Sequence, residues 1–170
     1  MKEIQDYIRE ISDFPKKGVI YKDISPLLGN IEMMRKAVDE LVANLPHQNI
    51  DKVVGIESRG FFLATLLADR LNAGFVPIRK PGKLPYKTFQ EKYDLEYGQD
   101  MLEIHQDALL KGEKVLIHDD VLATGGTAEA AVKLINRFEA EIVQLNFILE
   151  IPFLKGREKI QNQKVYSLLV

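Results

Sequence analysis

The stretch Lys114–Thr127, KVLIHDDVLATGGT, decides the expected fold. Its apolar run at 115–117 (VLI) predicts a short strand that is buried on both faces of a parallel sheet. Two adjacent carboxylates, Asp119 and Asp120, are expected to end this strand, and a turn of small residues follows. Beyond the turn, apolar side chains recur at the spacing of a helix, at Ala131, Leu134, Ile135 and Phe138.

The turn after the acid pair has the composition of an anion site. A helix N-terminus exposes unpaired backbone N–H groups and carries a partial positive charge, so it attracts phosphate. Gly125 and Gly126 let the backbone approach a phosphate closely, and the hydroxyls of Thr124 and Thr127 can donate hydrogen bonds to it. The sequence therefore predicts a phosphate cradle made of Ala123, Thr124, Gly125, Gly126 and Thr127.

The acid pair must serve another purpose, because carboxylates repel a phosphate. Asp119 and Asp120 are better suited to accept hydrogen bonds from sugar hydroxyls or to help hold a divalent cation. A phosphate cradle beside a binding site for a diol fits a ribose 5-phosphate. The alternative is purely structural, with acids that cap the next helix and glycines that only permit the turn.

Composition limits the class of protein. A chain of 170 residues suits one domain, residues 1–170, with a sizeable core. The net charge of −2, from 23 basic and 25 acidic residues, gives no reason to expect a nucleic acid or an anionic membrane as partner. Without cysteine there are no disulfides or thiolate sites, and three scattered histidines disfavour a histidine metal cluster. No apolar run is long enough to span a bilayer and no leader pattern is present, so we expect a cytoplasmic protein.

Strand and helix patterns alternate along the rest of the chain, which predicts an α/β fold with a central, mostly parallel sheet flanked by helices. Residues 13–30 are rich in proline and glycine yet apolar, which favours a packed irregular segment near a site, or else an N-terminal arm at an oligomer interface. Strands are expected at 52–56, 75–79, 141–151 and 165–169, and helices at 2–11, at 31–45 and from Leu63 to Leu71.

A second polar turn, Glu57-Ser58-Arg59-Gly60, follows the strand expected at 52–56. Such turns present backbone N–H groups to anions, and the guanidinium fork of Arg59 suits phosphate oxygens. Both polar turns fall at the carboxyl ends of parallel strands, where ligands of α/β sheets bind. Two anion sites at one edge predict a substrate with two phosphate-bearing ends, although Arg59 by itself is also compatible with a surface salt bridge.

Residues 80–98, KPGKLPYKTFQEKYDLEYG, interrupt the alternation. A long segment without a clear element in a compact domain favours a functional lid over a site or a mobile hairpin. Lys80 and Lys83 could then neutralise a leaving group, and Glu96, next to Tyr97, could act as general acid or base after closure. The alternative is an exposed β-hairpin that its lysines keep soluble.

The opening stretch resembles the phosphoribosyl-pyrophosphate (PRPP) motif of the type I phosphoribosyltransferases. The resemblance covers nearly the whole chain and points most of all to the members that use adenine, through SRGF, RKPGKLP and LEYG. It implies a single-domain type I phosphoribosyltransferase fold, with a small N-terminal hood (1–30) facing the base and a flexible lid or hairpin (80–98). The stretches that carry it are DFPKKGVIYKDISPLL (13–28), GIESRGF (55–61), IRKPGKLPYKT (78–88), YDLEYG (93–98), VLIHDDVLATGGT (115–127) and LKGREKI (154–160).

The resemblance also implies an activity and its requirements. Adenine and PRPP would give AMP and pyrophosphate, as in purine salvage. Mg²⁺ would be held mainly by PRPP, with Asp119 or Asp120 contacting it through water, and the protein would have no metal site of its own. A homodimer is implied, with small-molecule substrates and no nucleic acid or membrane partner.

Residue roles carry over by position. Asp119 and Asp120 would bind the ribose hydroxyls, and the phosphate cradle would bind the 5′-phosphate. Arg59 would hold pyrophosphate in catalysis. The remaining roles are pyrophosphate binding by Lys80 and Lys83, PRPP binding by Arg79 in its own or the partner subunit's site, proton handling by Glu96, and adenine binding by Ile20, Lys22 and Tyr97.

Two positions depart from the family pattern. Lys22 stands where many members have arginine, and His118 replaces the usual apolar residue before the acid pair. Rival functions are a phosphoribosyltransferase for another purine or a pyrimidine, and a PRPP-sensing regulator without catalysis. An aspartyl phosphatase is disfavoured because Val121 stands where a second acid is needed, and a P-loop NTPase because the glycine pair lacks a following Lys-Ser/Thr.

Overall fold

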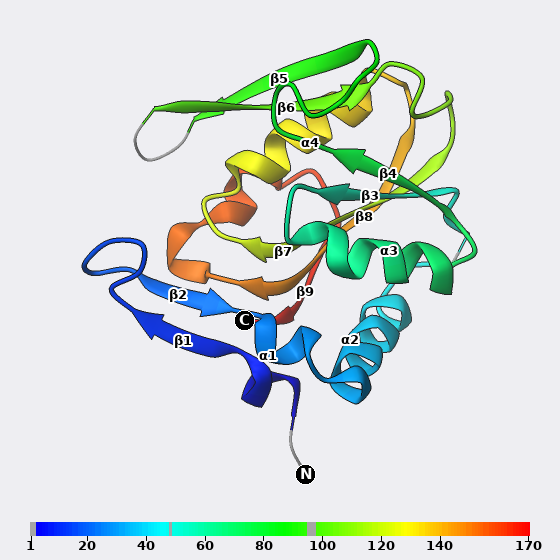
Figure 1. Ribbon diagram of the computed structural model, residues 1–170. Coiled ribbons are helices and arrows are strands. Elements are labelled where there is room, and N and C mark those ends of the chain that lie inside the picture. Colours follow the sequence, from blue (N-terminus) through cyan, green and yellow to red (C-terminus); the bar gives the residue numbers. More distant parts are fainter. Residues whose placement is uncertain (1–2, 48, 95–97) are drawn as a thin grey trace. The chain divides into compact units, whose positions relative to one another are not determined.

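The computed structural model describes residues 3–47, 49–94 and 98–170, and the backbone divides into two compact units, 1–40 and 41–170. Figure 1 shows the elements of both units in chain order. The expectation of one domain over 1–170 stays a prediction.

The first unit contains a short β-hairpin. Strands β1 (Arg9–Ser12) and β2 (Ile20–Asp23) pair antiparallel, after the 3₁₀ helix η1 (Ile4–Tyr7) and before α1 (Ser25–Leu28). The prediction of a helix over 2–11 is therefore wrong. Its apolar spacing fits a helix, but pairing with β2 holds residues 9–12 extended.

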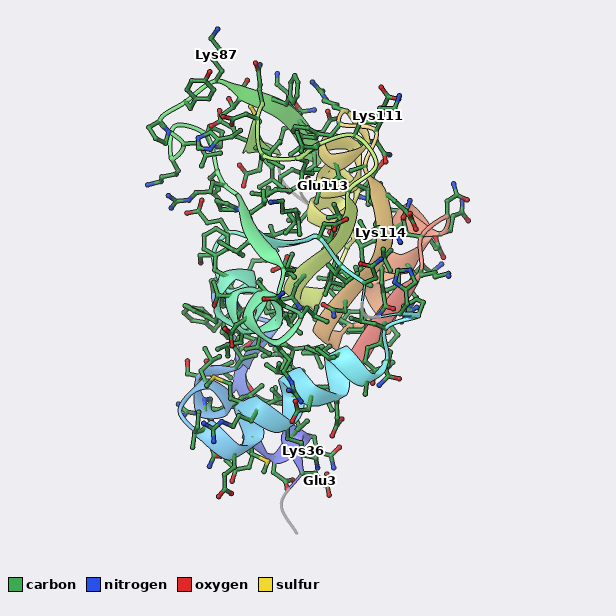
Figure 2. The ribbon with its side chains drawn as sticks, turned by 90° about the vertical axis from the view of Figure 1, so that its right-hand side faces the viewer. Glu3, Lys36, Lys87, Lys111, Glu113 and Lys114 are labelled. Atoms are coloured by element: carbon green, nitrogen blue, oxygen red, sulfur yellow. The ribbon has the colours of Figure 1, made fainter. Side chains whose placement is uncertain are left out.

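Helix α2 (Ile31–Ala43) begins where the sequence predicts. The Asn30 side chain accepts a hydrogen bond of 3.0 Å from the backbone N–H of Met33, which satisfies one of the free donors of the first turn. Lys36 on this helix forms an ion pair with Glu3 at 2.6 Å, and Figure 2 labels both side chains. This local pairing ties α2 to the beginning of the chain.

The second unit is built on a five-stranded sheet in the order β4-β3-β7-β8-β9, with every neighbouring pair parallel. Strand β7 lies in the middle of the sheet and β4, which contains Pro77, lies at an edge, as the proline predicts. The bounds are β3 (Lys52–Ile56), β4 (Gly74–Ile78), β7 (Lys114–Leu122), β8 (Glu141–Glu150) and β9 (Val165–Leu169).

Two helices pack on this sheet, and both contact the central strand β7. Helix α3 (Gly60–Arg70) packs on β3 and β7, and helix α4 (Gly126–Asn136) packs between β7, β8 and a hairpin of strands β5 (Thr88–Asp94) and β6 (Gln99–His105), as Figure 1 shows. One apolar core joins the sheet, α4 and the hairpin. It includes Val54, Ile56, Leu102, Ile104, Val115, Ile117, Leu134, Ile135, Leu145 and Phe147.

The hairpin reading of 80–98 agrees with the described residues, because residues 88–94 form β5 and pair in antiparallel register with 99–105. Two other expectations about local structure need correction. The segment 13–30 is not irregular throughout, because it contains β2 and α1. Strand β7 does not end at the acid pair but continues through it to Leu122. The carboxylates are therefore held in the ladder with β8, which fixes their backbone more firmly than a turn would.

Candidate functional site

The acid pair lies within β7 and its two members have different surroundings. Asp119 lines a cavity at the carboxyl end of the sheet, whereas Asp120 is only 5% exposed and pairs with Arg59, with 2.7 Å between Arg59 Nε and Asp120 Oδ2. Burial raises the pKa of Asp119 well above its usual range, and the adjacent Asp120 charge adds to this. Burial also raises the pKa of Asp120, although Arg59 opposes the shift. The pair thus offers a half-buried carboxyl group that faces the cavity, beside a buried one that Arg59 holds in place. Carboxyl oxygens of this kind can accept hydrogen bonds from hydroxyl groups.

The phosphate cradle contributes four of its five residues to that cavity, all except Gly126. The cavity has a volume of about 50 Å³, several times the ~15 Å³ that one water molecule needs. Gly125 has φ +78° immediately before α4, and Gly126 opens the helix. This is the left-handed conformation that glycine adopts without cost, and it turns the chain so that the helix N-terminus faces the cavity. The cavity is lined by Asp119, Val121, Leu122, Ala123, Thr124, Gly125, Thr127, Ala128 and Phe147.

Two glycines allow other backbone segments to approach this site. A Cβ atom at Gly60, the first residue of α3, would lie 2.8 Å from Asp119 Oδ1. A Cβ atom at Gly125 would lie only 2.3 Å from the carbonyl oxygen of Gly156, which opens the 3₁₀ helix η3 (Gly156–Ile160). Sequence reasoning missed Gly156, although it lies within the LKGREKI stretch that carries the resemblance.

The turn after β3 is organised by Glu57. Its carboxylate accepts hydrogen bonds from Arg79 Nε at 3.3 Å, from Arg79 Nη2 at 3.2 Å and from the backbone N–H of Lys80 at 2.8 Å. Burial pushes the pKa of Glu57 upward, but the hydrogen bonds from Lys80 and Arg79 outweigh it and the net pKa is lowered. Glu57 therefore stays charged and holds Lys80, the first residue of segment 80–98, against the turn.

Lys80 and Lys83 are placed differently from each other. The Lys80 ammonium lies 2.9 Å from Asp100 Oδ2, which also accepts a hydrogen bond from the Tyr93 hydroxyl at 3.1 Å. Burial raises the pKa of the Tyr93 hydroxyl, and the side chain of Thr127 in the phosphate cradle acts against this rise. Lys83 contributes its backbone carbonyl, which accepts a hydrogen bond of 3.3 Å from Arg79 Nη1, and its side chain is exposed.

The structure thus brings together most of the residues predicted for PRPP binding. Arg59 reaches the acid pair, the acid pair borders the phosphate cradle, and Arg79 and Lys80 share Glu57 as a partner. Ile20 and Lys22 belong to the first unit, where Ile20 is exposed and Lys22 forms an ion pair with Glu10. Glu96 and Tyr97 lie outside the described residues. Their roles stay predictions.

The donors at the site are compatible with Mg²⁺, since carboxylate oxygens are its preferred protein ligands and the carboxylate of Asp119 lines the cavity. Within residues 3–47, 49–94 and 98–170, no group of three or more His, Asp or Glu side chains could hold a metal ion by itself. Among the described helices, none is both long and apolar enough to cross a membrane.

Comparison with known proteins adds an independent finding. Residues 28–165 match the family model for the phosphoribosyl transferase domain. A protein of Christiangramia forsetii named adenine phosphoribosyltransferase is 65% identical over 167 residues, which cover 98% of each chain.

Solved structures give the same picture. The crystal structure of adenine phosphoribosyltransferase from Thermoanaerobacter pseudethanolicus has a TM-score of 0.95 at 45% identity, covering 98% of this chain and 96% of that chain. The Saccharomyces cerevisiae enzyme, in complex with an iminoaltritol bisphosphate and adenine, has a TM-score of 0.92 at 40% identity, with 98% and 96% covered.

Proposed function

Because this chain belongs to the phosphoribosyltransferase family, we propose that it transfers the 5-phosphoribosyl group of PRPP to N9 of adenine, giving AMP and pyrophosphate. One observation carries the proposal. Asp119 on β7 and residues of the phosphate cradle line one cavity, and Arg59 reaches the neighbouring Asp120 from the turn after β3. A sugar, its 5′-phosphate and a second anionic group would then be held at one edge of the sheet.

The reaction is a displacement at C1 of the ribose. The bond from C1 to the pyrophosphate oxygen breaks and pyrophosphate leaves with the electron pair, while N9 of adenine bonds to C1. The phosphate cradle binds the 5′-phosphate, and Asp119 and Asp120 accept hydrogen bonds from the ribose hydroxyls. With the 5′-phosphate and the ribose hydroxyls both held, only C1 can shift, from the leaving pyrophosphate oxygen toward N9 of the base.

Charge on the departing pyrophosphate is stabilised by Arg59, together with Lys80 and Lys83. Mg²⁺, when bound, supplies further charge neutralisation on pyrophosphate, and Asp119 or Asp120 would contact it through water. Arg79 supports this region through Glu57, whichever subunit's site it serves. The proton that N9 loses passes to the carboxylate of Glu96.

Choice of base is assigned to Ile20, Lys22 and Tyr97. A backbone carbonyl that accepts from the 6-amino group, and an N–H that donates to N1, favour adenine over a 6-oxopurine. The wrong base would leave buried polar groups mismatched, at a cost of about 1–3 kcal/mol for each group. The relatives named above and the adenine bound to the yeast enzyme support this assignment. A homodimer and a cytoplasmic location complete the proposal.

A panel of bases tests the function. Purified protein with PRPP and Mg²⁺ is offered adenine, hypoxanthine, guanine and uracil in turn, and nucleotide formation is measured. We expect AMP from adenine and little product from the other bases. Product from hypoxanthine or guanine alone would assign the enzyme to another purine, and absence of any nucleotide would leave a PRPP-binding protein without catalysis.

Glu96→Ala tests the proton-handling role. We expect a lower kcat with PRPP binding largely kept, because general acid–base catalysis typically contributes about 10²–10⁴-fold while PRPP is held elsewhere. Steady-state kinetics and PRPP binding are measured in parallel. Near-normal turnover in the variant would remove Glu96 from the mechanism.

A further inference from the structure

The phosphate cradle rests on a segment that no role in the reaction has yet included. Chain segment 151–160 follows β8 and contains the 3₁₀ helices η2 (Pro152–Leu154) and η3. Gly156, the first residue of η3, is buried. The backbone of Gly156 meets the backbone of the cradle directly, without side chains between them.

The contact leaves no room for a side chain on either partner. A Cβ atom at Gly156 would lie 2.3 Å from the carbonyl oxygen of Ala123 and 3.1 Å from the backbone nitrogen of Gly125. A Cβ atom at Gly125 would in turn meet the Gly156 carbonyl at 2.3 Å. Both close distances are to backbone atoms, which cannot rotate away as the end of a flexible side chain can.

These backbone atoms belong to the groups that bind phosphate. The carbonyl of Ala123 shares a rigid peptide plane with the N–H of Thr124, so pushing the oxygen away turns the N–H as well. The nitrogen of Gly125 carries the next N–H of the cradle. A side chain at Gly156 would therefore change the direction of two N–H donors at once, those of Thr124 and Gly125.

An ion pair between a half-exposed arginine and a buried glutamate fixes the segment in this position. Arg157, the residue after Gly156, donates to Glu150 with three hydrogen bonds, from Nε at 2.7 and 2.9 Å and from Nη2 at 2.7 Å. Glu150 also accepts from the hydroxyl of Ser167 at 2.8 Å, and Arg157 Nη1 donates to the carbonyl of Val165 at 3.2 Å. The hydrogen bond from Arg157 is the main reason that the pKa of Glu150 is lowered, so the pair stays charged.

We propose that Gly156 is a positioning residue for the phosphate cradle, and that the Arg157–Glu150 pair holds it there. The cradle keeps its shape because bare backbone supports it from behind, and the ion pair anchors that backbone to the end of β8 and to β9. This inference rests on the proposed function, since it takes the anion of the cradle to be the 5′-phosphate of the ribose.

Gly156→Ala is the direct test, with ribose 5-phosphate as the probe, because this ligand needs the cradle and the acid pair but not pyrophosphate or adenine. Misaiming one or two charged hydrogen bonds should raise the Kd of ribose 5-phosphate about tenfold to a hundredfold in calorimetry. The KM for PRPP should rise in the same proportion, whereas the KM for adenine should stay close to that of the unchanged protein.

Gly29→Ala is the matched control. A Cβ atom there would lie 3.4 Å from its nearest neighbour, which is ordinary contact, and Gly29 has a helical φ of −76°. This variant should bind ribose 5-phosphate as the unchanged protein does. Thermal unfolding of both variants shows whether each is folded at the temperature of the binding measurement.

If Gly156→Ala does not fold, Arg157→Lys tests the same positioning role through the ion pair. Lysine keeps the charge but not the fork that makes three hydrogen bonds to Glu150, so the Kd of ribose 5-phosphate should rise about threefold to tenfold. Ribose 5-phosphate binding that is unchanged in every folded variant overturns the inference. Failure of the unchanged protein to bind ribose 5-phosphate at all would instead overturn the assignment of the cradle in the proposed function.

Discussion

The two regions proposed to bind anions in this molecule are built in opposite ways. The phosphate cradle offers backbone N–H groups and hydroxyls around a cavity of about 50 Å³, and its shape is set by two glycines in backbone contact. The region proposed for pyrophosphate offers cationic side chains, and these already have carboxylate partners: Arg59 pairs with Asp120, Arg79 with Glu57 and Lys80 with Asp100.

This difference would separate tight binding of the 5′-phosphate from release of the pyrophosphate. On the proposed roles, a phosphate that enters the cradle meets no cation that must first leave a carboxylate. A pyrophosphate group would instead compete with three carboxylates for their cations, and its departure would let those ion pairs form again. The 5′-phosphate end of the substrate would thus be held by a fixed site, and the leaving end by a site whose cations have carboxylate partners within the protein.

The largest expected effect is on the pH dependence of stability. It concerns β7, which carries the acid pair and leads into the cradle. His118 on β7 is fully buried, and its Nδ1 lies 2.7 Å from Asn146 Oδ1 on β8. Burial lowers the pKa of His118 from 6.5 to about 4. In the unfolded chain His118 takes up a proton below pH 6.5, but in the folded protein it does so only near pH 4. Its contribution therefore makes the protein less stable as the pH falls from 6.5 to 4, by about 3 kcal/mol in total.

His118→Leu isolates this effect from the carboxylates, which titrate in the same range. Chemical denaturation at pH 7.5 and at pH 4.5 gives the free energy of unfolding of both proteins, and the unchanged protein should lose stability relative to the variant at the lower pH. If the free energy of unfolding falls equally in the two proteins between pH 7.5 and pH 4.5, His118 takes up its proton in the folded state as readily as in the unfolded chain. The centre of β7 would then be less tightly packed than described here.

A smaller effect is expected when the leaving-group region is weakened alone. Arg59→Gln removes a cation from that region and should raise the inhibition constant of pyrophosphate about tenfold, the loss expected for one charge-assisted hydrogen bond. Binding of ribose 5-phosphate should change less, because its phosphate is held by the cradle. Equal losses for both ligands would show that the two regions do not act separately.

The smallest effect tests whether the carboxylate partners compete with the ligand. In Asp100→Asn the ammonium of Lys80, whose side chain is 54% exposed, loses its ion pair. Exposed ion pairs are worth about 0.2–1 kcal/mol, so pyrophosphate should bind up to about fivefold more tightly. Product-inhibition kinetics measure this, with Lys111→Ala, which breaks a remote exposed pair with Glu139, as control. Weaker binding would mean that Asp100 positions Lys80 instead of competing for it.

The sequence predicts the parallel sheet well because its strands are continuous apolar runs between clear turns. Strands β3 and β9 have the predicted bounds, and the helix stop at Asn72, with φ 52°, lies where predicted. The hairpin of 9–23 was not predictable from spacing, since Tyr7, Ile8 and Ile11 also fit one face of a helix and only pairing with β2 selects the extended form.

The candidate site also has a part that the sequence predicts and a part that only the fold shows. Asp119, Asp120 and the cradle carry their chemistry in their residue types, and adjacency in the chain places them together. The partners of the cations do not follow from the sequence, because Glu57 meets Arg79 and Lys80 only after β3 and β4 have paired. Gly156 has no functional group, so only its approach to Gly125 shows its importance.

The order of the strands has a consequence for how this protein is made. Strand β7 lies at the centre of the sheet, between β3 and β8, yet residues 57–113 separate it from β3 along the chain. A growing polypeptide that has reached β6 contains β3 and β4 but neither the central strand nor the acid pair. Closing so long a loop costs chain entropy before the new contacts form, so this topology delays the central pairing. The acid pair and the phosphate cradle are therefore absent until β7 and the start of α4 have been made, and a chain truncated before Lys114 lacks both.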